Sequence, residues 1–180
     1  MVREIPEIDK IVSGVAELMV VSAKTAPKTR GRDDIEMKIV KDRDVIEKIC
    51  KKMEEVGKEK GFAFFTRDAN SVRKSSAIFL IGVNNRKPVE LNCHACGFDC
   101  REMLKVEKSG DYTGPSCIFK ILDLGIAIGS ALKVTSMIGV DSRVMYTVGV
   151  GAKKAGVMQS GVVIGIPLSA TGKNIFFDRG

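Results

Sequence analysis

AIFLIGV, residues 77–83, is an unbroken apolar run that is rich in β-branched and aromatic side chains. A run of this length is typical of a strand buried on both faces of a sheet, so it predicts the central strand. GVVIGIPL at 161–168 has a similar composition and predicts a second buried strand. IEMKIV at 35–40 alternates apolar and polar residues, which predicts a half-buried strand. The short apolar run at 62–65 predicts a further strand.

Two amphipathic helices precede the central strand in the chain. Apolar residues recur every three or four positions over residues 8–23, which predicts a helix with one buried face. The same spacing follows Asp42 and ends before Gly61. Asp42 is a favourable N-cap and Gly61 a favourable helix stop, so a second helix is expected between them.

The second half of the chain predicts two more helices. Residues 117–134 form a long apolar helix that opens at Cys117. Its small residues Gly125, Gly129 and Ser130 permit close approach by a second subunit or by another element of the same chain. Residues 142–155 favour a helix, although periodicity alone leaves a strand open.

The order of these elements predicts an α+β fold, a sandwich of two or three layers. The chain has 180 residues, of which 44% are hydrophobic and 28% charged, as expected of one compact domain over residues 1–180. Residues 84–117 interrupt the pattern with Gly, Pro, Asn and Cys and predict a loop-rich insertion that carries a metal site.

Composition argues against several partners and locations. The net charge is +7, but the basic residues are scattered among nearly as many acidic ones, so we expect no nucleic-acid partner. No uncharged apolar stretch approaches the roughly 18 residues of a membrane span, and the N-terminus has no apolar run of the signal-peptide type. We therefore expect a cytoplasmic protein with no membrane partner.

Four of the five cysteines have the spacing C-x2-C-x3-C-x16-C at Cys93, Cys96, Cys100 and Cys117. Three closely spaced thiolates can wrap one side of a 4Fe–4S cluster while a distant fourth locks the loop onto the domain. Structural zinc uses the same ligands but more often presents two C-x2-C pairs, so a zinc site is the alternative. Disulfides are not expected in a reducing compartment.

Two other residues near this chemistry receive simpler interpretations. His94 lies between two of the predicted ligands and is expected to face solvent or to support the site, because four thiolates complete it. Cys50 lies on the apolar face of the second helix and is expected in the core.

The acidic side chains that could suggest acid–base work are far apart and are expected to be caps or surface charges: Asp123, Asp141 and Asp178. No catalytic residue is assigned.

With these residues in view, the chain resembles a prokaryotic family of uncharacterised ferredoxin-domain-containing proteins. The segments that carry the resemblance span nearly the whole chain: SAKTAPKTRGRDDIE, NCHACGFDC, GPSCIFKILDLGIAIGSA and GIPLSATGKNIFFDR. The resemblance implies a 4Fe–4S cluster with Cys93, Cys96, Cys100 and Cys117 as ligands. The family's usual pattern is C-x2-C-x4-C, and this chain has one residue fewer before Cys100. The family's reaction is not known, so no substrate follows.

A fainter resemblance is to flavin-dependent nitroreductases, in which an early helix ends in a turn similar to Ala26-Pro27-Lys28. This resemblance implies a nitroreductase-like fold and FMN as a second cofactor. Lys28, Arg30 and Arg32 would then bind the flavin phosphate, because cationic side chains form charge-assisted hydrogen bonds with phosphate. The alternative is that these residues cover a loop surface.

Electron transfer is the expected activity, with a redox partner protein or a small-molecule electron carrier. If FMN also binds, the protein is an oxidoreductase in which a one-electron centre exchanges electrons with a two-electron one. The alternatives are a non-enzymatic zinc-stabilised binding module and a cluster-based sensor. A homodimer is compatible with the small residues of the helix at 117–134.

Overall fold

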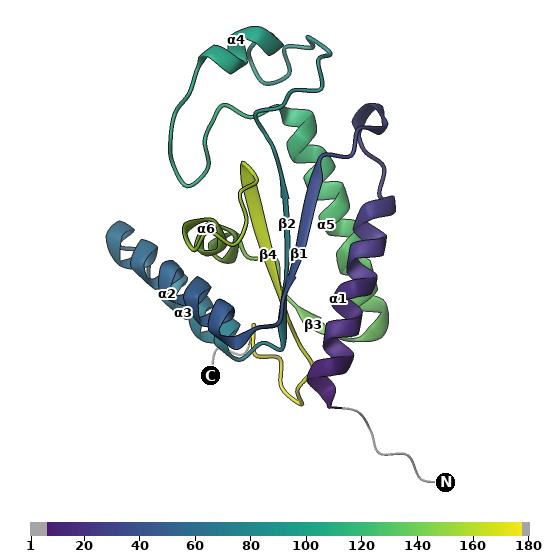
Figure 1. The fold of residues 1–180 in the computed structure, drawn as a ribbon, viewed down its shortest axis with the longest axis vertical. Helices are drawn as coiled ribbons and strands as arrows, with labels where there is room; N and C mark the ends of the chain where they lie inside the picture. Colours follow the sequence, from purple (N-terminus) through teal and green to yellow (C-terminus); the bar gives the residue numbers. More distant parts are fainter. Residues whose placement is uncertain (1–6, 178–180) are drawn as a thin grey trace.

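The computed structural model describes residues 7–177 of the chain. Its centre is a sheet of four antiparallel strands in the order β1-β2-β4-β3 (Figure 1). The strands are β1 (Ile35–Val40), β2 (Ala77–Val83), β4 (Val162–Ser169) and the short β3 (Asp141–Ser142). The strands predicted at 35–40, 77–83 and 161–168 are therefore present.

β2 is an inner strand of this sheet, as its sequence predicts. Phe79 lies opposite Ile39 of β1 on one side and Ile166 of β4 on the other. All seven residues of β2 are buried, because helices cover both faces of the sheet. On an inner strand with two covered faces, a polar side chain would be buried on either face, which explains the uninterrupted apolar run.

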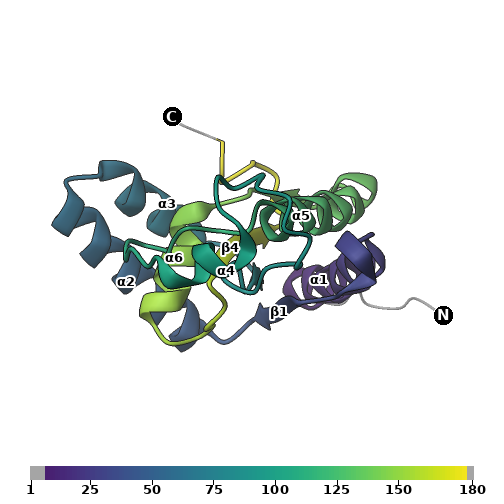
Figure 2. The ribbon, with the colours of Figure 1, turned by 90° about the horizontal axis from the view of Figure 1, so that it is seen from above.

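Helices form a layer on each face, which gives three layers in all (Figure 2). On one face lie α1 (Ile8–Thr25) and α5 (Ile118–Ile138), and on the other lie α2 (Arg43–Lys60), α3 (Ala63–Arg73) and α6 (Tyr146–Lys154). Each layer contributes its own apolar core. The fold is thus an α+β sandwich, and the three-layer alternative is the correct one.

The second helix begins and ends where its caps predict. The Asp42 carboxylate accepts hydrogen bonds from the backbone N–H groups of Asp44 and Val45. Gly61 ends α2 with a φ of 70°, a left-handed conformation that glycine adopts at little cost.

The strand predicted at 62–65 is wrong, because these residues open α3. Phe65 is buried while Phe62 and Phe64 are exposed. α3 crosses α2 closely at Gly57, where a Cβ atom would lie 2.7 Å from the Cβ of Phe65. The apolar run therefore serves a helix–helix contact, and four residues are too few for periodicity to distinguish the two structures.

Residues 142–155 are mainly helical, but α6 begins only at Tyr146. Asp141 does not cap it; Asp141 and Ser142 pair with β4 as β3. The contact between α6 and β4 requires glycine, since a Cβ atom on Gly149 would lie 1.7 Å from the carbonyl oxygen of Val163. Helix and strand backbones approach here more closely than side chains allow.

α5 starts directly after Cys117, which is its N-cap residue. Within the described part of the chain, α5 alone is long and apolar enough to span a membrane by length and composition. It packs against α1, where the Ser22 hydroxyl donates to the carbonyl oxygen of Ser130 at 2.7 Å. Gly125 and Gly129 are exposed, and a Cβ atom on either would meet nothing within 4 Å. The chain's own elements thus leave these two glycines uncovered.

Residues 84–117 leave the end of β2, cross above the sheet and return to the start of α5 (Figure 1). The segment contains one short helix, α4 (Cys100–Lys105), and is otherwise irregular. An outgoing limb runs from residue 84 to Lys108, and a returning limb runs from there to Cys117. A bridge between Lys108 and Gly114 joins the two limbs. We call residues 84–117 the cysteine loop.

Candidate metal centre and its polar network

The backbone of the cysteine loop turns sharply around the first cysteines. Glu90, Asn92 and His94 have φ values of 58°, 48° and 55°, which are uncommon for residues other than glycine. Gly97 has a φ of 84°, and its N–H donates to the carbonyl oxygen of His94 at 2.8 Å. Residues other than glycine in this conformation cluster at functional sites, so the turn marks this part of the loop as a candidate site.

The loop brings two of the predicted ligands into one small apolar cluster. Cys117 is buried there with Val89 and Met103, and the half-buried Cys96 packs against it. Cys100 opens α4 and is half-buried, while Cys93 is exposed. All of these thiols are free.

The donor set fits an iron–sulfur cluster, since four thiols lie in or beside one loop and none is in a disulfide. Within residues 7–177, however, no three His, Cys, Asp or Glu side chains are already gathered so that they could hold a metal ion. The four-cysteine site at Cys93, Cys96, Cys100 and Cys117 therefore stays a prediction.

Cys50 and His94 lie where their sequence contexts place them. Cys50 is fully buried in the core between α2 and α3, where burial raises the pKa of its thiol to about 11. His94 is exposed on the loop.

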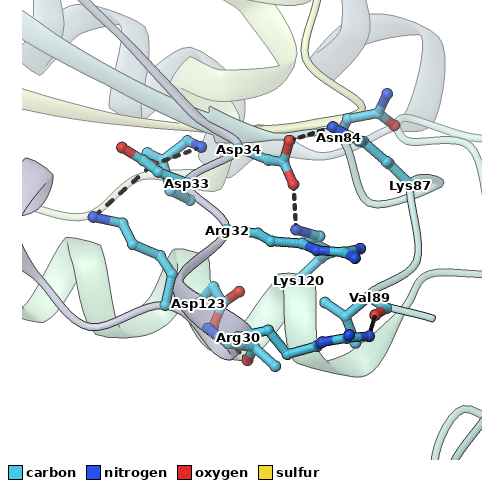
Figure 3. A network of polar contacts seen from close by, with 12 residues as sticks. Arg30, Arg32, Asp33, Asp34, Asn84, Lys87, Val89, Lys120 and Asp123 are labelled. Carbon is cyan, nitrogen blue, oxygen red and sulfur yellow. Dashed lines mark hydrogen bonds and ion pairs between the residues drawn. The ribbon is translucent and has the colours of Figure 1, made fainter. Parts of the chain in front are cut away.

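A buried ion pair supports the N-terminal end of α5 (Figure 3). Lys120 is 1% exposed, and its Nζ atom lies 2.5 Å from Asp34 Oδ2. Lys87, at the start of the cysteine loop, binds the other oxygen of Asp34 at 2.6 Å. Hydrogen bonds from Lys120 and Lys87 lower the pKa of the Asp34 carboxyl.

Asp123 is a buried acid in α5, which corrects the expectation that it caps a helix or lies on the surface. It is 3% exposed, and its Oδ1 accepts from both the N–H and the hydroxyl of Thr29 at 2.8 Å. Its Oδ2 has no hydrogen-bond partner among the described residues. Asp141 is half-buried and accepts from Asn174, and Asp178 lies outside the described residues.

Lys120 and Asp123 were not predicted as site residues, although the sequence carries a signal for them. Both are charged residues near the start of an otherwise apolar helix. A charge within such a helix requires a buried partner, because an unpaired buried charge is costly.

Lys28 makes its hydrogen bonds to the nearby end of α1. Its Nζ donates to the carbonyl oxygens of Ala23 and Lys24, which belong to the last turn of α1. The Asp33 carboxylate lies 3.9 Å away. Lys28 therefore satisfies the C-terminal end of α1, where carbonyl groups lack helical partners.

Arg30 and Arg32 reach the cysteine loop. Arg30 donates to the carbonyl oxygen of Val89 at 3.1 Å, from a backbone with a φ of 57° (Figure 3). Arg32 pairs with Glu90 at 3.0 Å. The segment that carries Arg30 and Arg32 is thus joined to the cysteine loop, and the guanidinium groups predicted to bind phosphate contact protein groups in this structure.

Two cavities adjoin the cysteine loop. One, of about 560 Å³, lies against Cys100 and Arg101 and is rimmed by Pro88 and Leu104. The other, of about 630 Å³, lies between the ends of the strands and the returning limb of the loop and is lined mostly by polar residues, among them Glu36, Lys153 and Ser160.

Comparison with known proteins identifies the family. The profile of a family described as "Uncharacterized protein containing a ferredoxin domain" matches residues 113–179. An uncharacterised protein of Archaeoglobus fulgidus is 51% identical over 166 residues, which cover 91% of this chain and 89% of the relative. The chain belongs to this ferredoxin-domain family. Of the four predicted ligands, only Cys117 lies within the range that the profile matches.

The ferredoxin-domain protein shares its fold with nitroreductases. A nitroreductase with bound FMN from Desulfitobacterium hafniense superposes with a TM-score of 0.59 at 11% identity, over 94% of this chain and 81% of the other. An FMN-dependent nitroreductase from Clostridium difficile gives 0.56 at 12% identity, over 95% and 79%. The predicted nitroreductase-like fold is therefore confirmed.

Proposed function

We propose that this ferredoxin-domain protein is a redox protein with a 4Fe–4S cluster held by Cys93, Cys96, Cys100 and Cys117. One observation carries the proposal: Cys96 and Cys117 share a single apolar cluster although they come from opposite limbs of the loop. The family description and the free thiols support it. Such a cluster supplies one-electron transfer.

The position of Cys117 suits a ligand of a negatively charged cluster. This cysteine directly precedes α5, and the N-terminal end of a helix stabilises negative charge. Lys120, whose N–H donates to the Cys117 carbonyl oxygen at 3.1 Å, connects this first turn to Asp34 through its buried ammonium group. The apolar side chains of Val89 and Met103 keep water from this side of the site.

The exposed side of the cysteine loop suits electron transfer to or from a partner. Cys93 is exposed, and the cavity of about 560 Å³ reaches Cys100. We infer that a redox protein or a small-molecule electron carrier approaches from this side, in the cytoplasm, where thiols stay reduced.

Purification without oxygen, followed by an absorption spectrum and iron, sulfide, zinc and flavin assays, tests the proposal. We expect about four iron and four sulfide per chain. Cys117→Ser should lose most of both, while Cys50→Ser, a change at a thiol remote from the loop, should keep them. Zinc without sulfide would contradict the proposal and favour the binding module. A cluster lost reversibly to oxidant, with a partner bound in one state only, would favour the sensor.

A second candidate function adds FMN, which makes the protein an oxidoreductase. It is favoured by the fold, which is shared with a nitroreductase whose structure contains FMN. We propose that Lys28, Arg30 and Arg32 bind the phosphate, in which case Arg30 and Arg32 exchange their present partners Val89 and Glu90 for it.

Flavin fluorescence titration should show at least tenfold weaker binding for Arg30→Met, whereas Lys48→Met on the exposed surface of α2 should bind like wild type. Equal binding by both variants would contradict this assignment.

A further inference from the structure

We propose that Asn85 and Arg86, which follow β2, form a clamp that holds Cys100 and Cys117 in position relative to each other. This inference rests on the proposed function, because it assigns positioning residues to the same metal site. Neither residue is a predicted ligand.

Arg86 joins the two limbs of the cysteine loop. Its guanidinium donates to the carbonyl oxygens of Met103 and Leu104 at 3.0 Å each and to that of Pro115 at 3.2 Å. Met103 and Leu104 lie near the end of α4, the helix that begins at Cys100. Pro115 is two residues before Cys117, so one side chain connects the elements that present both cysteines.

Asn85 fixes the limb that carries Cys117. Its backbone carbonyl oxygen accepts from the N–H of Cys117 at 2.9 Å. Its side-chain Nδ2 donates to the carbonyl oxygen of Thr113 at 2.8 Å and to the hydroxyl of Ser116 at 2.6 Å. Asn85 is 0% exposed, so these bonds are shielded from competing water.

The clamp is anchored to the buried inner strand of the sheet. Asn85 comes two residues after the last residue of β2, the buried inner strand. It also packs against the segment before β4, where a Cβ atom on Gly161 would lie 1.9 Å from Asn85 Oδ1. Through Asn85, the limb that carries Cys117 is thereby held next to the end of the sheet.

The chemistry of arginine suits this task. A guanidinium presents five donors in a planar fork and stays charged, so it can serve several carbonyl groups from different elements at once. The carbonyl groups near a helix C-terminus carry partial negative charge and lack helical partners. Lysine offers a point charge on a flexible stem and should replace this function only in part.

Hydrogen exchange on the metal-free chain, followed by reconstitution with ferrous iron and sulfide, tests the clamp. Arg86→Met should speed amide exchange in residues 100–117, including the Cys117 N–H, by at least tenfold, while β2 and β4 exchange as in wild type. After reconstitution it should release iron to a chelator at least tenfold faster. Arg86→Lys should fall between the two. Lys105→Met on the exposed surface of α4 removes a positive charge outside both the clamp and the cavity, and it should behave as wild type.

The outcomes separate the two proposals. Unchanged exchange in Arg86→Met and Arg86→Lys would overturn the clamp, and faster exchange with unchanged iron release would overturn its role at the metal site. If Arg86→Met does not fold, by circular dichroism, Arg86→Lys decides through the same two measurements. A wild-type chain that takes up no iron and sulfide would overturn the proposed function and the positioning role together, even where the exchange data show the clamp itself.

Discussion

Lys120 and Asp34 are 86 residues apart in the sequence and form an ion pair of 2.5 Å in which the lysine is almost completely buried. Asp34 precedes β1, Lys120 lies in the first turn of α5, and Lys87 completes the contact from the cysteine loop. One carboxylate thus connects three separate segments beneath the predicted metal site.

Asp34→Asn should lower the free energy of unfolding by about 3 kcal/mol, because removal of one partner leaves the Lys120 charge buried without compensation. Chemical denaturation of the metal-free chain measures the change. Glu59→Gln, at an exposed position of α2, should change stability by less than about 0.5 kcal/mol. A loss in Asp34→Asn no larger than that in the control would contradict the contribution of the buried pair.

Stability should depend on pH through the same carboxyl. The pKa of Asp34 is lowered in the folded state by the hydrogen bonds from Lys120 and Lys87, so the folded protein binds this proton less tightly than the unfolded chain. The stabilisation is therefore complete above the unfolded pKa of about 3.9 and is lost as the pH falls through the lower folded value. Denaturation from pH 7 to pH 3 should show the gap between wild type and Asp34→Asn closing below about pH 4. A constant gap would refute this account.

The cysteines should differ widely in their reactivity in the metal-free protein. Alkylation requires the thiolate, and Cys93 is exposed, whereas Cys50 is fully buried with a pKa raised to about 11 by burial. With iodoacetamide at pH 8, mass spectrometry should find Cys93 modified first and Cys50 only after unfolding. Equal rates at these two thiols would show that the α2 core opens readily.

The exposed face of α5 should form a homodimer interface. Large apolar side chains remain exposed along this helix around Gly125 and Gly129: Ile118, Ile121, Leu122 and Ile126. A helix that is apolar all round is normally covered on every side. Sedimentation should find wild type as a dimer and Ile126→Lys as a monomer, while Phe62→Lys at the exposed α2–α3 corner stays dimeric. A wild type that is monomeric at all concentrations would contradict the prediction.

The elements that the sequence predicted well are those whose patterns are long or capped. β2 and α2 are examples, since seven consecutive apolar residues and the Asp42 and Gly61 caps leave little choice of structure. The run at 62–65 was too short, and its helical state depends on the approach of Phe65 to Gly57 in another helix. The cysteine spacing likewise identified the four candidate ligands but not the residues that we propose position them, Asn85 and Arg86.

By itself, the sequence determined the strands and helices whose patterns are long or capped, and which thiols are candidate ligands, because these properties depend on neighbours within one or two turns of chain. Only the tertiary structure decided that Arg86 contacts both limbs of the cysteine loop and that Asp34 contacts Lys120. The physical reason is that a buried charge or amide needs a hydrogen-bonding or ionic partner. Which residue becomes that partner depends on how the layers pack together rather than on any local sequence pattern.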